Sequence, residues 1–177
     1  MKINIRQEIP TDYKIVAEII ESAFKNEPYS DQTEHLLVER LRYTKAFIPE
    51  LSLVAEYRGQ VVGHILLTKI KIKDGHFSFD SLALAPVSVK PNFQGKGIGG
   101  QLINKAHEAA RALGLNSIVL IGHENYYPRF GYERASKYGI KLPFEAPDKN
   151  CMVIALTKNG LDGVRGMVEN PKTFFEH

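Results

Sequence analysis

A cluster of glycines between a predicted strand and a predicted helix constrains this chain more than any other stretch of its sequence. Four of the ten residues from 91 to 100, PNFQGKGIGG, are glycine. Glycine loses more conformational freedom on folding than any other residue, and it fills no space in a core. So many glycines in one turn indicate that something outside the chain approaches the backbone closely here.

The place of this cluster suggests an anion. The preceding strand is predicted to end near Val89, and the following helix to begin near Ile98. The first N–H groups of a helix have no partner within it, and the helix dipole is positive there, so this end favours an anion. Lys96 adds charge at the rim. We therefore predict a phosphate-binding loop, since an ordinary turn needs only one or two glycines.

Two other phosphate loops fit less well. A Walker loop requires Ser or Thr directly after its Gly-Lys pair, and Gly97 follows Lys96 here. The dinucleotide fingerprint G-x-G-x-x-G is matched by Gly95, Gly97 and Gly100, with Glu124 where a ribose-binding acid would stand. That fingerprint normally begins at the end of its strand, whereas PNFQ intervenes here and the preceding strands form an antiparallel meander.

The hydrophobic periodicity of the whole chain predicts one α/β domain, residues 1–177, with a mixed and mostly antiparallel central sheet flanked by helices. A strand, helix, strand order around the glycines predicts one parallel strand pair. We expect a helix at 11–24 capped by Thr11 and a second helix started by Asp31 and Glu34. Expected strands are 2–6, 51–57, 60–72, 77–89, 117–122, 151–156 and a weak last strand in the tail from Gly160, which carries Phe174 and Phe175.

Composition excludes several classes of protein. The 23 basic and 20 acidic residues give a net charge of +3 with no arginine-rich run, which argues against a nucleic-acid partner. The single cysteine, Cys151, opens an apolar strand and is expected in the core, which is compatible with the reducing cytoplasm. No apolar run suggests a signal peptide or a membrane span. His123 and Glu124 lack the second histidine of a zinc motif, so no metal is expected.

Two motifs carry a resemblance to a known family. The run QGKGIG resembles the Q/R-x-x-G-x-G/A pyrophosphate signature of the GCN5-related N-acetyltransferase (GNAT) superfamily. Further along, YPRFGY resembles the Y-x-x-x-G-F/Y element near the C-terminal end of that family. The longer run NYYPRFGY resembles a bacterial subgroup of predicted acetyltransferases related to YhbS.

The resemblance implies an acetyltransferase that uses acetyl-CoA as cosubstrate without a metal. It implies that the strand before the loop splays from its parallel neighbour, pairs with pantetheine through its backbone and offers an N–H to the thioester oxygen. The residues implied in cosubstrate binding are Val87, Ser88, Val89, Gln94, Gly95, Lys96, Gly97, Ile98, Gly99 and Gly100.

Tyr127 matches the tyrosine with which many family members protonate the departing thiolate. A phenol with a pKa of about 10 donates uphill to a thiolate whose thiol has a pKa of about 8.5, so we expect a modest contribution. Adjacent positions of a helix face different ways, and we expect Tyr126 to be the packing residue of the pair.

The acceptor is an amine, on a small molecule or a peptide, that must lose a proton before it attacks. Glu124, His123, Asp80 and water stay open as the base. The loop at 26–31, with Glu27 and Asp31, is where the family sets acceptor specificity. Asn125 stands too close to Tyr127 to match the asparagine with which some members hold pantetheine.

Two alternatives to the acetyltransferase remain. One is a module that binds acyl-CoA without turnover, and the other is an NAD-binding oxidoreductase. The oligomeric state, including a homodimer, is left open by the sequence.

Overall fold

The computed structural model describes residues 1–28 and 30–172, and the chain divides into two compact units. Unit 1 is Met1–Thr68, Ala85–Ala109 and Lys172, and unit 2 is Lys69–Leu84 and Ala110–Pro171. Strands β3 and β4 each contribute one part to either unit. The single domain expected from the sequence stays a prediction.

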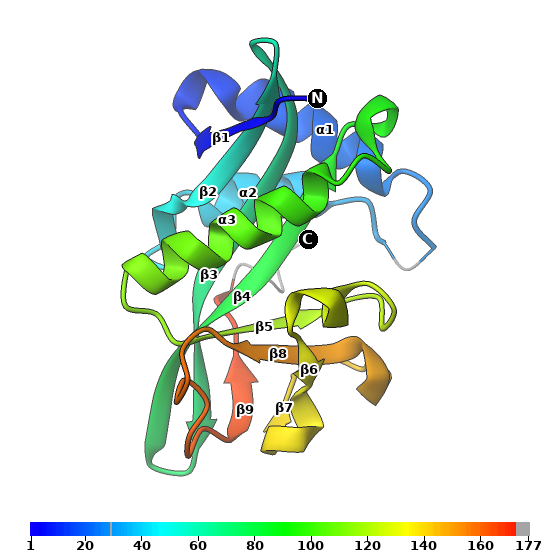
Figure 1. Ribbon diagram of the computed structural model, residues 1–177. Helices are drawn as coiled ribbons and strands as arrows, with labels where there is room; N and C mark the ends of the chain where they lie inside the picture. Colours follow the sequence, from blue (N-terminus) through cyan, green and yellow to red (C-terminus); the bar gives the residue numbers. More distant parts are fainter. Residues whose placement is uncertain (29, 173–177) are drawn as a thin grey trace. The chain divides into compact units, whose positions relative to one another are not determined.

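Unit 1 contains β1 and β2, parts of β3 and β4, and most of the residues of α1, α2 and α3 (Figure 1). Strand β2 pairs with β1 on one side and with β3 on the other. The elements are β1 (Asn4–Gln7), α1 (Tyr13–Phe24), α2 (Glu34–Leu41), β2 (Phe47–Tyr57), the first part of β3 (Gln60–Asp74), the last part of β4 (Phe77–Val89) and most of α3 (Ile98–Ala112).

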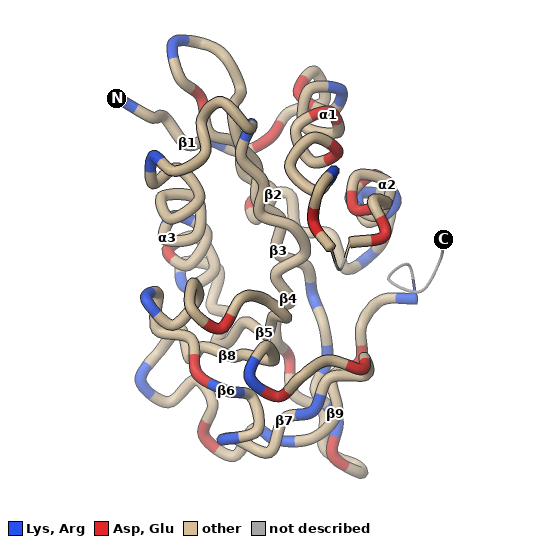
Figure 2. Tube along the Cα trace, turned by 90° about the vertical axis from the view of Figure 1, so that its right-hand side faces the viewer, with Lys and Arg blue, Asp and Glu red and all other residues tan. Residues whose placement is uncertain are grey.

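The strands of unit 1 have helices on both faces, α1 and α2 on one and α3 on the other (Figure 2). Apolar residues on one face of α1 and of α2 pack against apolar residues of β2 and β3. These residues are Val16, Ile19, Ile20, Val38 and Leu41 of the helices and Val54, Val61 and Leu66 of the strands. On the opposite face, Gly63 of β3 lies against Leu102 and Ile98 of α3.

The helix starts differ from the sequence prediction. A 3-10 turn, Pro10–Asp12, precedes α1, and Asp12 rather than Thr11 is its N-cap. The carboxylate of Asp12 instead accepts the N–H of Ile9 at 2.8 Å and pairs with Arg6. The predicted cap is therefore wrong, because a proline directly before Thr11 favours a tight turn over a helix entry.

Unit 2 contains the parallel strand pair. Its β5 (Ser117–Ile121) runs parallel to β4, with Leu82 opposite Ile118 and Ala83 opposite Val119, and antiparallel to β8 (Cys151–Ala155). The remaining strands are β6 (Glu133–Arg134) beside β8, and β9 (Gly166–Glu169) beside β3 and β7 (Ile140–Lys141).

These pairings confirm the predicted fold class, a mixed and mostly antiparallel sheet with flanking helices, in which β4 and β5 form the predicted parallel pair. Strands β7 and β9 form a second parallel pair, which the sequence did not predict. Strand β9 confirms the predicted strand in the tail. Phe174 and Phe175 lie outside the described residues. None of the described helices is long and apolar enough to span a membrane.

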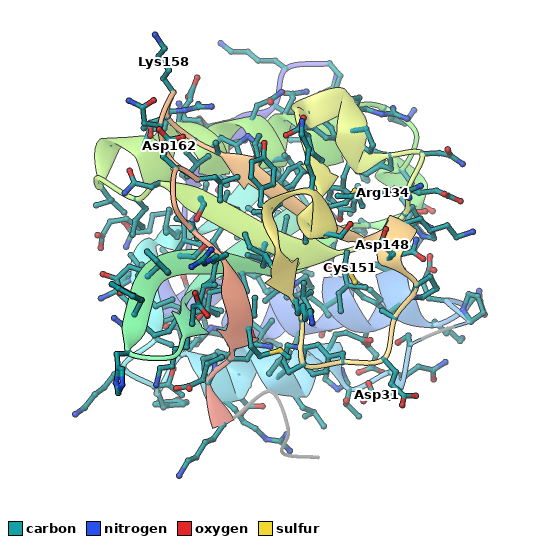
Figure 3. The ribbon with its side chains drawn as sticks, turned by 90° about the horizontal axis from the view of Figure 1, so that it is seen from below. Asp31, Arg134, Asp148, Cys151, Lys158 and Asp162 are labelled. Carbon is teal, nitrogen blue, oxygen red and sulfur yellow. The ribbon has the colours of Figure 1, made fainter. Side chains whose placement is uncertain are left out.

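Cys151 opens β8, as the sequence predicts, but it is only partly buried. Near it, Arg134 and Asp148 form an ion pair at 3.4 Å (Figure 3). Burial, and then the negative charge of Asp148, raise the pKa of the thiol. A raised pKa keeps the group as an unreactive thiol. Among the residues that the structure describes, no three His, Cys, Asp or Glu side chains gather as metal ligands.

Candidate active site

The predicted phosphate loop joins the end of β4 to α3 within unit 1. After Val89 the chain makes a 3-10 turn, Pro91–Phe93, and then enters the glycines. The side-chain amide of Gln94 donates to the carbonyl of Val89 at 3.0 Å, and the N–H of Lys90 donates to Val62 of β3 at 2.8 Å. In this structure Gln94, expected among the binding residues, uses its amide group to close the base of the loop.

Two glycines give the loop its shape. Gly95 has φ +75° and Gly97 has φ +80°, a left-handed conformation that favours glycine. No atom lies within 4 Å of the position where a Cβ would stand on either residue, so neither glycine is required by packing. Backbone turns of this kind aim successive N–H groups into a concavity that suits an anion. The space beside the Cα atoms of Gly95 and Gly97 is therefore free for a bound group.

The first turn of α3 follows directly. The carbonyl of Gly97 accepts the N–H of Gln101 at 3.1 Å, which starts the helical hydrogen bonding. Ile98 is buried and anchors the turn, whereas Lys96 is exposed at the rim and Gly99 and Gly100 are partly exposed. The positive end of the dipole of a 15-residue helix therefore lies at the loop.

The last residues of β4 include one unusual side chain. Ser88 is 2% exposed, and its Oγ has no hydrogen-bond partner among the described residues, whereas its neighbours Val87 and Val89 are partly exposed. A buried hydroxyl without a partner costs about 1–3 kcal/mol, so such an atom marks a place where a bound group would supply one. The residues present thus fit the cosubstrate that the sequence motif implies.

Tyr127 lies in unit 2, at the start of a 3-10 turn, Tyr127–Phe130, which ends at Gly131 with φ +101°. The side chain is 8% exposed, and its ring makes edge contacts with the rings of Tyr126 at 5.0 Å and Tyr132 at 5.7 Å. Burial, and then the neighbouring Tyr126, raise the pKa of the Tyr127 phenol above its ordinary value. The phenol therefore stays protonated at neutral pH.

The prediction that Tyr126 is the packing residue of the two tyrosines is wrong. Tyr126 is only partly buried, and the guanidinium of Arg129 lies 4.8 Å from its ring centroid. Tyr127 is the more buried of the pair because its ring rests directly over Gly122. A packing role for Tyr127 is thus real, and a role in proton transfer would come in addition to it.

The three side chains considered as bases are surface groups. Glu124 pairs with Lys149 at 3.3 Å, Asp80 forms an ion pair with Lys71, and His123 is exposed. None of the three side chains is buried, so burial singles out none of them as the base.

Of the two acidic residues in the loop between the first helices, Glu27 is exposed and Asp31 lies near the start of α2. The helix begins at Glu34 as expected, but Thr33 rather than Asp31 is its N-cap. The carboxylate of Asp31 accepts the N–H of Thr33, the N-cap of α2, at 3.0 Å. Asp31 therefore has a structural role at the start of α2.

Sequence reasoning missed a buried polar network in unit 1. Arg42 donates two hydrogen bonds to Glu8, at 2.7 and 3.1 Å, and the Ser52 hydroxyl donates to Glu8 at 2.9 Å. His64 Nε2 lies 3.0 Å from Ser52 Oγ. Burial lowers the pKa of His64 to about 4, while Glu8 acts in the opposite direction. The members come from four separate segments, so no spacing in the sequence could reveal them.

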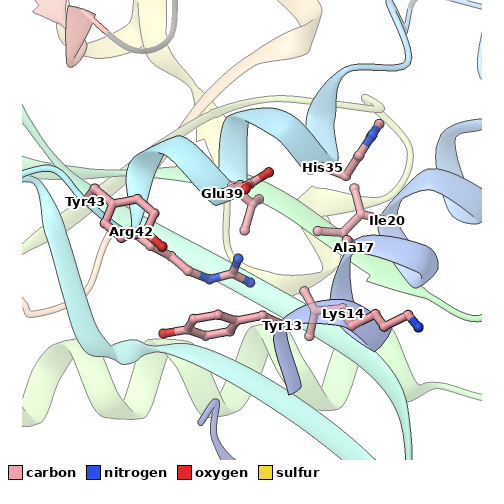
Figure 4. A pocket seen from close by; sticks show the side chains of 10 residues that line it. Tyr13, Lys14, Ala17, Ile20, His35, Glu39, Arg42 and Tyr43 are labelled. Atoms are coloured by element: carbon pink, nitrogen blue, oxygen red, sulfur yellow. The ribbon is translucent and has the colours of Figure 1, made fainter. Parts of the chain in front are cut away.

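A cavity of about 230 Å³ lies between α1 and α2, beside this network (Figure 4). Arg42 forms part of its wall, with the guanidinium 3.9 Å from the ring centroid of Tyr13. Because Glu8 already neutralises Arg42, the cavity presents no unbalanced charge from this residue to a ligand.

The sequence of this chain is similar to a known family and to proteins of known sequence. Residues 15–132 match the family model described as Acetyltransferase (GNAT) family. The chain is 39% identical over 115 residues to the Uncharacterized N-acetyltransferase YjhQ of Escherichia coli K12, a match that spans 64% of either protein. It is 27% identical over 171 residues to the Uncharacterized N-acetyltransferase YhbS of the same strain, spanning 96% of this chain and 97% of YhbS.

Solved structures agree with these matches. The crystal structure of YhbS from E. coli in complex with CoA superimposes with a TM-score of 0.85 and 26% identity, covering 99% of this chain and 93% of that one. A GNAT family acetyltransferase from Brucella melitensis in complex with acetyl-CoA gives a TM-score of 0.80 and 35% identity, covering 98% of each chain. By sequence and by fold, this chain therefore belongs to the acetyltransferase (GNAT) family.

Proposed function

We propose that this protein transfers the acetyl group of acetyl-CoA to a primary amine by direct attack on the thioester. The observation that carries the proposal is the loop at Gly95–Gly97, whose two left-handed glycines leave the backbone open to an anion at the start of α3. The CoA and acetyl-CoA complexes of the two related structures support the same cosubstrate.

Each part of the chain has a proposed task. Backbone N–H groups from Gln94 to Gly100 hold the diphosphate, and Lys96 adds charge from the rim. The backbone of Val87, Ser88 and Val89 pairs with pantetheine and directs an N–H at the thioester oxygen, where it stabilises developing negative charge.

Proton transfer needs two further groups. Tyr127 gives its phenolic proton to the departing thiolate. Burial keeps the phenol protonated and so able to donate, but the raised pKa also makes the transfer to the thiolate more uphill. The amine loses its proton to Glu124, His123, Asp80 or water, among which we prefer none. We expect a small-molecule or peptide acceptor and a cytoplasmic protein.

A release assay tests the proposal. Purified protein is incubated with acetyl-CoA and a panel of amines, and free thiol and acetylated amine are measured together. We expect both to appear in equal amounts with at least one amine. Binding of acetyl-CoA without thiol release for any amine would favour the acyl-CoA-binding module instead.

A melting assay with separate ligands excludes the remaining alternative. A ligand that binds only the folded state raises the unfolding temperature, so acetyl-CoA should raise it and NAD should not. The mostly antiparallel sheet already speaks against the doubly wound arrangement that the dinucleotide fingerprint requires. Stabilisation by NAD alone would overturn the proposed function.

A further inference from the structure

Gly122, the residue after β5, is a glycine for a reason unlike that of the loop glycines. Its φ lies outside the left-handed region, so its backbone conformation suits any residue. A Cβ there would stand 2.3 Å from Cε2 and 2.7 Å from Cδ2 of the Tyr127 ring. Such distances are far below van der Waals contact, so the ring occupies the space that a side chain would need. The bare Cα of Gly122 is the surface on which the ring rests.

Asn150 holds this surface in place. The N–H of Gly122 donates to the carbonyl of Asn150 at 2.9 Å, and the side-chain Nδ2 of Asn150 donates to the carbonyl of Gly122 at 3.0 Å. These two bonds extend the β5–β8 ladder by one pair beyond Ile121 and Cys151.

The side chain replaces a backbone donor in that pair. In a regular antiparallel pair the N–H of Asn150 would donate to Gly122. That N–H instead donates to the carbonyl of Pro147 at 2.9 Å, within the turn Asp148–Asn150. The carboxamide of Asn150 supplies the missing donor, which a residue without a side-chain N–H at this distance could not do.

The ring of Tyr127 also contacts two neighbouring aromatic rings, but only by their edges. Tyr126 and Tyr132 both meet the ring of Tyr127 edge to face, with interplanar angles of 85° and 78°. A hydrogen-bonded turn from His123, the residue after Gly122, leads into the 3-10 turn of Tyr127, and the N–H of Tyr126 donates to the carbonyl of His123 at 3.1 Å. A shift of the Gly122 backbone therefore moves the ring, and with it the phenolic oxygen.

We propose that Asn150 and Gly122 are positioning residues for the phenol of Tyr127, with the Asn150 carboxamide fixing the Gly122 carbonyl and the bare Gly122 Cα seating the ring. The inference rests on the proposed function, in which that phenol gives a proton to the thiolate. Neither residue touches the reacting atoms. Their replacement should lower kcat and leave the KM for acetyl-CoA almost unchanged.

Asn150→Asp is the main test, because it keeps the shape of the side chain and removes the Nδ2 donor. Gly122→Ala adds the Cβ that meets the ring. We expect kcat to fall about 10-fold or more in each, with the KM for acetyl-CoA within about twofold of the parent value. The control is Gly160→Ala in the same unit, where a Cβ would stand 2.3 Å from the carbonyl oxygen of Asn116. Gly160 is far in sequence from the turn that carries Tyr127. Its folded fraction should keep the parent kcat.

A double-mutant cycle separates positioning from general damage. If the two residues act through the phenolic hydroxyl, Asn150→Asp should lower kcat in the parent protein and have little further effect in Tyr127→Phe. Two results would overturn the inference if Tyr127→Phe alone has a lowered kcat. One is an equal loss of kcat from Asn150→Asp in the parent and in Tyr127→Phe, and the other is no loss from Asn150→Asp in the parent. Normal turnover by Tyr127→Phe alone would instead refute the proposed acid role, and the inference with it.

Discussion

Two sites in the chain use glycine in opposite ways, the loop at Gly95 and Gly97 in unit 1 and Gly122 in unit 2. In unit 1, Gly95 and Gly97 are left-handed, and the places of their absent side chains are open. In unit 2, Gly122 has an ordinary conformation, and the ring of Tyr127 fills the place of its side chain. A glycine that faces open space leaves room for a molecule from outside, whereas a glycine filled by a neighbour serves the protein's own packing. We therefore propose a binding role for the first two glycines and a positioning role for Gly122.

The units also differ in how burial acts on titratable groups. Burial lowers the pKa of His64 in unit 1 and raises the pKa of Tyr127 in unit 2, in both cases by disfavouring the charged form. Unit 1 should therefore be weakened by acid and unit 2 by alkali.

Tyr127→Phe separates the ring's packing from its proton. Phenylalanine keeps the ring over Gly122 and removes the hydroxyl, so stability and acetyl-CoA affinity should change little while kcat falls about 10²-fold. Because burial raises the pKa of the phenol, the loss should be constant from pH 6 to 10. We would measure kcat for both proteins across that range. Equal rates would reduce Tyr127 to a packing residue, and a loss that shrinks toward pH 10 would contradict the raised pKa.

Acid should destabilise the protein through His64. Its pKa is about 4 when folded against an ordinary 6.5, so the unfolded chain takes up the proton first as the pH falls. The stabilisation is complete above pH 6.5 and is lost progressively down to about pH 4, amounting to about 2 kcal/mol by pH 5. Urea unfolding at pH 7.5 and 5 measures the difference.

The matched variants for that experiment are His64→Gln and His76→Gln. The first removes the buried titrating group and should flatten the dependence on acid, whatever its effect on overall stability. His76 is exposed, and its replacement should keep the dependence. An unchanged acid slope in His64→Gln would show that the slope comes from another group, such as Asp12, whose pKa is lowered first by its hydrogen bond from Arg6.

Lys96→Ala tests whether the affinity of the loop for acetyl-CoA comes from side-chain charge or from backbone N–H groups. Lys96 is exposed, so its attraction to a phosphate is screened by water and salt. We expect acetyl-CoA to bind about fivefold more weakly at low salt, a loss of about 1 kcal/mol that shrinks as salt rises. Lys105→Ala, on an exposed position of α3, is the control. A large deficit that salt does not change would mean that Lys96 makes a specific contact.

The sequence predicted the elements and the loop because their signals are local. Alternation of apolar residues located the strands, and the run QGKGIG located the glycine loop between β4 and α3, since both depend on neighbouring residues. The Thr11 cap failed because Pro10 creates a competing turn. The greater burial of Tyr127 over Tyr126 depends on Gly122. The polar network around Glu8 depends on four separate segments of the chain meeting. Such features arise from tertiary packing, which no local pattern contains.

The most direct test of the account compares two glycines that share a conformation but not a task. Gly97 has φ +80° and Gly59, in the turn between β2 and β3, has φ +77°, and neither has an atom within 4 Å of its Cβ position. Alanine should therefore strain both equally, and the two variants should lose similar stability. In calorimetric titration with acetyl-CoA, we predict that Gly97→Ala binds at least about tenfold more weakly, a loss of about 1.4 kcal/mol, while Gly59→Ala binds like the parent protein. Equal affinity in the two variants would contradict the claim that the glycine loop holds the cosubstrate through its open backbone.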